Sequence, residues 1–328
     1  MFNLKNFLSK IRRAPKVFYR RHIDRPLNQI HRYDFTSENN GWKKYGTTPI
    51  WGNSQTGTMF DPYVFEMEGK LNMVVSARKT KCLILIESMD GIIWKNPKIL
   101  LQGRSKMWDD DINRGCLIKR NNYFFLWYTG QYNGVSCIGF AQSIDGKFFN
   151  RILHKPVLKA DFPCEGVSVM NPCVLWDESA GLFKMWYSAG ENYEPDVICY
   201  AESEDGIKWN KRKQPVLTKH PGHKWEQYKI GGCNVVKNID GSYEMYYIGY
   251  QNVDVARICI AHSKDGVYWS RDENNLLLSP SKKSWDSDAV YKPSVIKLKE
   301  KDYLWYNGRR ACEEYIGLAI KTKESNGK

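Results

Sequence analysis

The sequence predicts an all-β fold: a five-bladed β-propeller built from four-stranded antiparallel blades, with the ring closed by an N-terminal strand. The main observation is the motif Ser-x-Asp-Gly-x-x-(Trp/Phe). It begins at Ser88, Ser143, Ser203 and Ser263, so the copies are spaced by 55, 60 and 60 residues. A steady period of this length indicates an array of similar units. An Asp-Gly pair between an apolar run and an aromatic residue favours a tight hairpin turn.

Strand patterns recur around each turn in a constant order. A strand such as Ile258–Ala261 precedes the turn, and an aromatic strand such as Leu182–Tyr187 comes before that. After the turn, short segments such as Pro156–Leu158 and Pro215–Leu217 complete a unit of four strands, which is one propeller blade. The first strand of each unit ends in paired aliphatic residues, at Val64-Phe65, Leu117-Ile118, Val174-Leu175, Val235-Val236 and Val295-Ile296.

The strand count predicts how the ring closes. Five first strands are present, but the last unit ends after Tyr315–Ile320 without its outermost strand. Residues 40–42, followed by Pro49 and Ile50, have the pattern of a fourth strand with no blade before them. We therefore expect the N-terminal strand to complete the last blade, which removes exposed sheet edges. The predicted propeller covers residues 35–328.

Residues 1–34 form a separate basic segment. Its apolar residues before Pro15 approximate one face of a helix, so it can lie on an anionic membrane surface or bring the protein to a lipid-linked acceptor. The alternative is a solvated or packed arm. The chain has a net charge of +13 but no nucleic-acid-binding motif, so we expect no nucleic-acid partner. The basic residues of this N-terminal segment are Lys5, Lys10, Arg12, Arg13, Lys16, Arg20, Arg21, Arg25 and Arg32.

The rest of the composition indicates a cytoplasmic protein. No stretch of 18 apolar residues and no secretory signal is present, so the expected location is the cytoplasm, either free or at the inner face of the membrane. The nine cysteines are odd in number and lack C-x-x-C spacing, which favours buried reduced thiols. His220 and His223 alone do not make a metal site, and no metal or cofactor is predicted.

The innermost strands line the channel of a propeller, so their polar residues are the first candidates for chemistry. Asp61 precedes Pro62, which predicts an extended backbone and a carboxylate that points into the channel. Arg114 occupies the matching position in the second blade, where it can pair with a carboxylate or an anionic ligand. The predicted substrate-binding residues are Arg78, Arg114, Asn171, Lys229, Asp288, Lys292 and Arg309.

Other acidic residues recur in the repeat and are interpreted as structural. Asp109, Glu226 and Asp286 each follow a tryptophan shortly before an innermost strand. Asp90, Asp145, Asp205 and Asp265 belong to the hairpin turns, where Asp accepts hydrogen bonds from its own turn.

Several of these motifs together resemble the five-bladed propellers of glycoside hydrolase families 43 and 32. The resemblance rests on the Trp-Asp pairs, Pro293–Ile296, Met185–Ser188 and the Ser-x-Asp-Gly turns, and it covers residues 40–320 approximately. It implies three carboxylates: a base or nucleophile, a charge-adjusting Asp and a general acid. By position these are Asp61, either Asp110 or Asp111, and Glu165. Glu165 lies seven residues before Pro172, whereas those families place the acid about two before.

The resemblance implies an enzyme that makes or breaks a glycosidic bond in the channel. The basic residues and the cytoplasmic prediction favour a glycosyltransferase of surface-polysaccharide biosynthesis, with a glycan or an anionic nucleotide sugar as substrate. The alternatives are an intracellular glycoside hydrolase, or a phosphorylase like those of the related family 130. A non-catalytic glycan-binding propeller is the alternative from another functional class.

Overall fold

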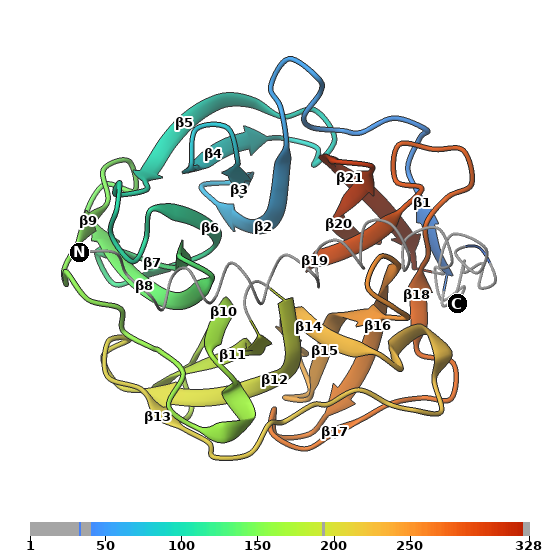
Figure 1. The fold of residues 1–328 in the computed structure, drawn as a ribbon. Helices are drawn as coiled ribbons and strands as arrows, with labels where there is room; N and C mark the ends of the chain where they lie inside the picture. Colours follow the sequence, from blue (N-terminus) through green and yellow to red (C-terminus); the bar gives the residue numbers. More distant parts are fainter. Residues whose placement is uncertain (1–32, 34–40, 192–193, 324–328) are drawn as a thin grey trace, which may run out of the picture.

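The computed structural model describes residue 33 and residues 41–191 and 194–323 of the chain. Five antiparallel sheets surround a central axis, and the first strand of each sheet lies nearest that axis (Figure 1). The predicted five-bladed β-propeller is therefore confirmed.

The blades follow one another along the chain. Blade 1 contains β2 (Met59–Met67), β3 (Lys70–Ala77), β4 (Cys82–Ser88) and β5 (Lys95–Gln102). Blade 2 contains β6 (Asp111–Arg120), β7 (Tyr123–Tyr132), β8 (Val135–Ser143) and β9 (Asn150–Arg151). Blade 3 contains β10 (Ser168–Asp177), β11 (Leu182–Glu191), β12 (Glu194–Ser203) and β13 (Asn210–Lys211). Blade 4 contains β14 (Lys229–Lys237), β15 (Tyr243–Tyr250), β16 (Ala256–Ser263) and β17 (Trp269–Ser270), and β18 (Leu276–Leu278) also pairs with β16. Blade 5 contains β19 (Ala289–Lys297), β20 (Lys301–Arg310), β21 (Glu313–Thr322) and β1 (Trp42–Lys44).

The ring closes through the N-terminal strand, as the sequence predicts. β1 pairs antiparallel with β21, with Trp42 opposite Lys321 and Lys44 opposite Ala319. Figure 1 shows β1, in blue, beside the red strands of the last blade. The Trp42 side chain is buried, and its ring meets that of Tyr246 edge-on at 6.3 Å. The closing strand β1 thus completes the sheet of blade 5 and packs against blade 4 through Trp42.

The fourth strands differ in detail from the prediction. In blades 2 and 3 the chain pairs immediately after the hairpin turn, as β9 and β13. The predicted segments Pro156–Leu158 and Pro215–Leu217 form only single bridges, between Leu158 and Ile138 and between Leu217 and Ile198. The two prolines have no N–H group to donate to a ladder, so these segments cannot extend the strand that precedes them.

The Ser-x-Asp-Gly turns are held by their own side chains. In the first turn, Asp90 Oδ1 accepts hydrogen bonds from the N–H groups of Ile92 and Ile93 at 2.8 Å, and Ser88 Oγ accepts one from Gly91 at 2.8 Å. These backbone donors lower the pKa of Asp90. The structural interpretation of the turn aspartates is therefore confirmed, because the carboxylate replaces missing backbone partners.

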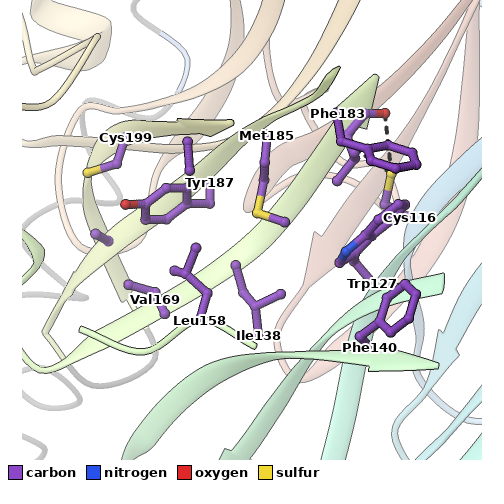
Figure 2. Packing of buried hydrophobic residues seen from close by; sticks show 13 residues of the cluster. Cys116, Trp127, Ile138, Phe140, Leu158, Val169, Phe183, Met185, Tyr187 and Cys199 are labelled. Carbon is purple, nitrogen blue, oxygen red and sulfur yellow. Dashed lines mark hydrogen bonds between the residues drawn. The ribbon is translucent and has the colours of Figure 1, made fainter. Parts of the chain in front are cut away.

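Tryptophans in the second strands of blades 2, 3 and 5 each donate a hydrogen bond to the hairpin turn of the following blade. The indole N–H donates to a turn-glycine carbonyl at 2.7 to 2.9 Å in every case. The pairs are Trp127 with Gly206, Trp186 with Gly266 and Trp305 with Gly91. Figure 2 shows the apolar cluster around Trp127, where side chains of blades 2 and 3 pack together. The repeat motif thus also serves as the joint between blades.

Replacing Trp127 by Phe tests this joint. The variant keeps an aromatic ring in the cluster but removes the inter-blade donor to the Gly206 carbonyl, which then keeps only the donor of its own turn, Trp209 at 3.0 Å. Loss of one hydrogen bond costs about 0.5–1.5 kcal/mol of unfolding free energy. Urea denaturation measures the loss. Trp269→Phe is the matched control, since the indole of the half-buried Trp269 donates only to Gly266 in its own turn. An equal loss in both variants would argue against the joint.

Candidate active site

Each innermost strand carries one β-bulge at the same place. The pairing register shifts between Phe60 and Tyr63 in blade 1, and at the corresponding point of the other four blades. The bulge residues have positive φ angles of 48° to 59°; they are Asp61, Arg114, Asn171, Gly232 and Lys292. The prediction that Asp61 is extended is therefore wrong. Proline disfavours the right-handed helical region for the residue before it, and the bulge places Asp61 in the left-handed region instead.

Side chains of the neighbouring blade hold these bulges in place. The N–H of Asp61 donates to Asn307 Oδ1 at 2.8 Å, and that of Arg114 donates to Ser76 Oγ at 2.9 Å. The N–H groups of Asn171 and Gly232 donate in the same way to Thr129 and Ser188. Because each acceptor lies in the second strand of the preceding blade, these contacts fix four of the five bulge residues around the channel.

Charged side chains of this ring meet at the channel centre. Arg114 Nε lies 3.2 Å from Asp61 Oδ2, and Lys292 Nζ lies 4.0 Å from Asp61 Oδ1. They line a cavity of about 30 Å³, together with Asn171. Asp61 is 3% exposed and Lys292 7% exposed. Burial, followed by the charge of Arg114, holds the pKa of Lys292 well below its usual value. We call this group of four residues the channel floor.

A larger cavity of about 560 Å³ shares Arg114 with the channel floor. It lies where the innermost strands of blades 1 and 2 begin, and β21 of blade 5 contributes to its wall. The structure brings four predicted residues to this cavity: Arg78, Asp110, Asp111 and Arg114. It also brings polar residues that the sequence analysis did not select, namely Lys81, Asn113, Gln131, Asn133 and Glu314.

Two carboxyl groups in this cavity have raised pKa values. Burial raises the pKa of Asp111 and also that of Glu314. Asp111 Oδ1 and Glu314 Oε2 have no hydrogen-bond partner within the described part of the chain. Arg78 Nη2 lies 3.8 Å from the other oxygen of Glu314. A buried carboxyl that keeps its proton at higher pH can serve as a proton donor.

Asp110 differs from its neighbour. It forms an ion pair with Lys81, and its Oδ1 accepts a hydrogen bond from the N–H of Lys106 at 2.8 Å. The hydrogen bond from Lys81 is the main cause that lowers the pKa of Asp110. Of the two carboxylates between which the sequence did not decide, Asp111 thus has the properties of an acid, and Asp110 remains ionised at the rim.

Glu165 is completely buried and does not line the cavity. Its oxygens accept hydrogen bonds from Tyr187 at 2.6 Å, from Lys211 at 2.8 Å and from the N–H groups of Asp161 and Phe162. Burial alone would raise its pKa, but the hydrogen bonds from Lys211 and Tyr187 lower it. With every lone-pair direction occupied and the ionised form favoured, the geometry does not support a general acid at this position.

Glu165 instead belongs to a repeated structural group. In three other blades a buried acid accepts a hydrogen bond from the second-strand tyrosine and pairs with a basic residue. These sets are Asp109 with Tyr128 and Arg151, Glu226 with Tyr247 and Arg271, and Asp286 with Tyr306 and Lys44. Glu165, Tyr187 and Lys211 are the blade 3 version, with Cys164 in place of tryptophan.

Three predicted substrate-binding residues lie outside both the 560 Å³ cavity and the channel floor. Lys229 Nζ pairs with Asp196 at 2.8 Å, and Asp288 Oδ2 accepts the N–H of Ala311 at 2.7 Å. Arg309 donates to the carbonyl of Asp254 at 2.5 Å. These contacts connect strands and turns of blades 3, 4 and 5 to one another.

Glu314 is the main residue that the sequence analysis missed. The candidates were sought on the innermost strands and at the ends of second strands, whereas Glu314 lies at the start of a third strand, opposite Arg309 of β20 in the ladder. The third strands begin at the same end of the blade as the innermost strands. A search of that end in every strand would have found the Glu313-Glu314 pair.

Metal and membrane features can be judged only within the described residues. Residues 41–191 and 194–323 contain no group of three or more His, Cys, Asp or Glu that could hold a metal ion. Over the same ranges, no helix has the length and hydropathy needed to span a bilayer. The predicted basic arm lies outside the described residues except for Tyr33, so membrane association and cytoplasmic location stay predictions.

Comparison with protein families and curated sequences gives partial matches. Residues 149–276 match the model of glycoside hydrolase family 130, described as β-1,4-mannooligosaccharide phosphorylase. Two Mycobacterium tuberculosis sequences, uncharacterized proteins MT1551 (strain CDC 1551 / Oshkosh) and Rv1502 (strain ATCC 25618 / H37Rv), are each 28% identical over 236 residues. The match covers 68% of this chain and 75% of each relative.

Solved structures match over most of the chain. One structure of a glycoside hydrolase has a TM-score of 0.70 at 19% identity, and the match covers 92% of this chain and 97% of that protein. A thermostable family-43 glycoside hydrolase has a TM-score of 0.67 at 20% identity, with coverages of 86% and 96%. A third structure comes from work on glycoside hydrolases of family GH130 that target β-1,2 mannosidic linkages. It has a TM-score of 0.64 at 15% identity, and the match covers 89% of this chain and 91% of that protein. The chain therefore has the five-bladed β-propeller fold found in glycoside hydrolases of families 43 and 130.

Proposed function

We propose that this protein is a carbohydrate-active enzyme that cleaves a glycosidic bond in the 560 Å³ cavity by transfer to phosphate. The partial match to the phosphorylase model and the likeness to glycoside hydrolase structures support cleavage. They favour the alternative named in the sequence analysis, a hydrolase or phosphorylase. These matches give no support to the glycosyltransferase interpretation, the nucleotide-sugar substrate or the membrane partner.

The observation that carries the proposal is Asp111 in its setting. Its carboxyl group is half-buried, its pKa is raised by burial, and one oxygen has no partner among the described residues. We assign it as the general acid that gives its proton to the glycosidic oxygen as the bond to the anomeric carbon breaks. The shortened glycan then leaves as a neutral alcohol.

Phosphate is the proposed acceptor because three cationic side chains line the same cavity as Asp111. They are Arg78, Lys81 and Arg114. Arg114 Nη1 is buried and has no hydrogen-bond partner in the described residues, so it is available to an anion. A phosphate oxygen held here forms the new bond to the anomeric carbon, and the products are a sugar 1-phosphate and the shortened glycan. Burial raises the pKa of Glu314, which favours its neutral form beside the anion and reduces repulsion.

Asp61 has a different role in this proposal from the predicted base or nucleophile. It is 3% exposed at the channel floor and lies between Arg114 and Lys292, with which its carboxylate forms ion pairs. We propose Asp61 as a positioning residue that orients the guanidinium of Arg114 towards the bound phosphate.

Product analysis tests the proposal. The full-length protein is incubated with β-1,4-mannooligosaccharides with and without inorganic phosphate, and products are separated by anion-exchange chromatography. The expected result is mannose 1-phosphate that forms only when phosphate is present. Free reducing sugar formed equally in both conditions would show hydrolysis, the second candidate, which the hydrolases within family GH130 favour. Binding of the oligosaccharides without either product would favour the non-catalytic glycan-binding interpretation.

A further inference from the structure

Tyr268 is an exposed aromatic residue between two surface hollows. It belongs to the hairpin turn of blade 4 and is 71% exposed. One hollow, of about 360 Å³, is lined by Arg212, Val216 and Tyr268; the other, of about 460 Å³, is lined by His262, Lys264 and Tyr268. Ser270 lines both as well. Tyr268 and Ser270 are thus shared by two adjoining hollows, which we together call the groove.

This groove lies on the opposite face of the ring from the candidate active site. In blade 4, Lys229 pairs with Tyr250 and Tyr250 pairs with Ala256, so β14 and β16 begin at the same end of the sheet. The 560 Å³ cavity lies at that end of blades 1 and 2. The turn that carries Tyr268 follows Ser263, at the far end of β16. A molecule bound at Tyr268 therefore leaves the candidate active site free.

The repeat itself shows that the turn does not require an aromatic residue here. Blade 3 carries Lys208 at the matching position, and its N–H donates to Asp205 Oδ1 at 2.8 Å. The N–H of Tyr268 donates to Asp265 Oδ1 at 2.9 Å in the same way. Since Lys208 and Tyr268 make the same turn hydrogen bond, the turn geometry does not require the ring of Tyr268.

The side chains around the ring combine an aromatic surface with hydrogen-bonding groups. The guanidinium of Arg212 lies 5.3 Å from the ring centroid of Tyr268, on the side of the smaller hollow. Ser242, Lys264 and Ser270, which carry hydroxyl and ammonium groups, line the larger hollow together with Tyr268. An aromatic ring offers apolar area to the C–H face of a sugar, and the hydroxyl and ammonium groups bond its hydroxyls.

We propose that the groove around Tyr268 is a second glycan-binding site, which holds one or two sugar units of a long chain while another part of that chain reaches the active site. The choice of a glycan as ligand rests on the proposed function. Because the groove and the cavity lie on opposite faces, the site adds effective concentration for a polymer and nothing for a short oligosaccharide.

Affinity electrophoresis tests the site directly, without any need for turnover. Wild type, Tyr268→Ala and Phe148→Ala migrate through native gels that contain soluble β-mannan, xylan or dextran. Phe148 is the matched control because it holds the same turn position in blade 2 and is 75% exposed. We expect at least one polymer to retard wild type and Phe148→Ala, and Tyr268→Ala to lose about 5- to 10-fold in affinity, as removal of one aromatic contact would give.

The result that would overturn the site is equal retardation of Tyr268→Ala and wild type, or no retardation of wild type by any of the three polymers. Failure of the proposed function gives a different pattern: no cleavage products appear, while Tyr268-dependent retardation remains. If cleavage occurs, kcat/KM on a trisaccharide is expected to be unchanged in Tyr268→Ala, and a loss there would also contradict a separate site.

Discussion

Replacing Asp111 by Asn is expected to lower kcat/KM for glycan cleavage by about 100- to 10,000-fold, the usual contribution of a general acid. The amide keeps the shape of the side chain but has no acidic proton for the leaving oxygen. In the wild type, kcat/KM is expected to fall as pH rises through the raised pKa of Asp111, because the ionised form cannot donate. Initial rates measured across pH for both proteins check this prediction.

The same substitution is expected to raise stability at neutral pH. Burial raises the folded-state pKa of Asp111, so between its ordinary and its raised pKa the folded protein holds a proton that the unfolded chain has released. Stability therefore decreases as pH rises through this window, and the cost of the buried charge persists above it. Asn carries no charge and removes this cost, so the melting temperature of the variant should rise at pH 7.

The matched control is Glu178→Gln, which changes an exposed carboxyl group on the turn between β10 and β11. It should leave both kcat/KM and melting temperature near those of wild type. An Asp111→Asn variant that keeps wild-type activity, or loses it together with its stability, would contradict the assignment of Asp111 as a buried acid.

Replacing Asp61 by Asn is expected to cost about 3–5 kcal/mol of unfolding free energy, as removal of one partner from a buried ion pair does. The variant leaves Arg114, which cannot lose its proton, without its counter-charge at 3.2 Å. It also removes the negative charge that lies 4.0 Å from Lys292, so the pKa of that lysine should fall further. Denaturant unfolding of the variant measures the loss.

A double-mutant cycle separates this pair from other effects of the substitution. Arg114→Gln and the Asp61→Asn/Arg114→Gln double variant complete the cycle, and the double variant should recover part of the loss because no unpaired charge remains between these two positions. A cost below about 1 kcal/mol for Asp61→Asn, or additive single effects, would show that the channel floor is not held by this ion pair.

The fold could be predicted from the sequence because each blade repeats the same local chemistry. The Asp-Gly turns and aromatic strands mark each unit. The extra strand near Trp42 supplies the fourth strand that the last blade lacks after β21. The ladder positions of the fourth strands were harder to predict. Pro156 and Pro215 interrupt those strands, and only tertiary pairing decides which residues on either side of the proline join the sheet.

The candidate site was predicted in part. Asp61, Arg114, Asn171 and Lys292 share one position of the repeat, so their convergence at the channel followed from the pattern. Their bulge and left-handed backbone did not, because both depend on acceptors such as Asn307 and Ser76 in neighbouring blades. Asp109 and Glu226 were interpreted as structural because each follows a tryptophan. Cys164 stands in place of that tryptophan before Glu165, so the sequence did not identify Glu165 as a structural acid.

The measurement that tests the central claim most directly compares two acids, Asp111 and Glu165, in the same cleavage assay. Asp111→Asn and Glu165→Gln are each assayed on the oligosaccharide that wild type cleaves, at a temperature where circular dichroism shows both to be folded. The structure predicts that Asp111→Asn loses about 100-fold or more in kcat/KM. It predicts that Glu165→Gln keeps near wild-type activity per folded molecule but unfolds at lower temperature, because its hydrogen bonds with Lys211 and Tyr187 are weakened. Loss of activity in folded Glu165→Gln, with activity retained in Asp111→Asn, would contradict the placement of the reaction in the 560 Å³ cavity.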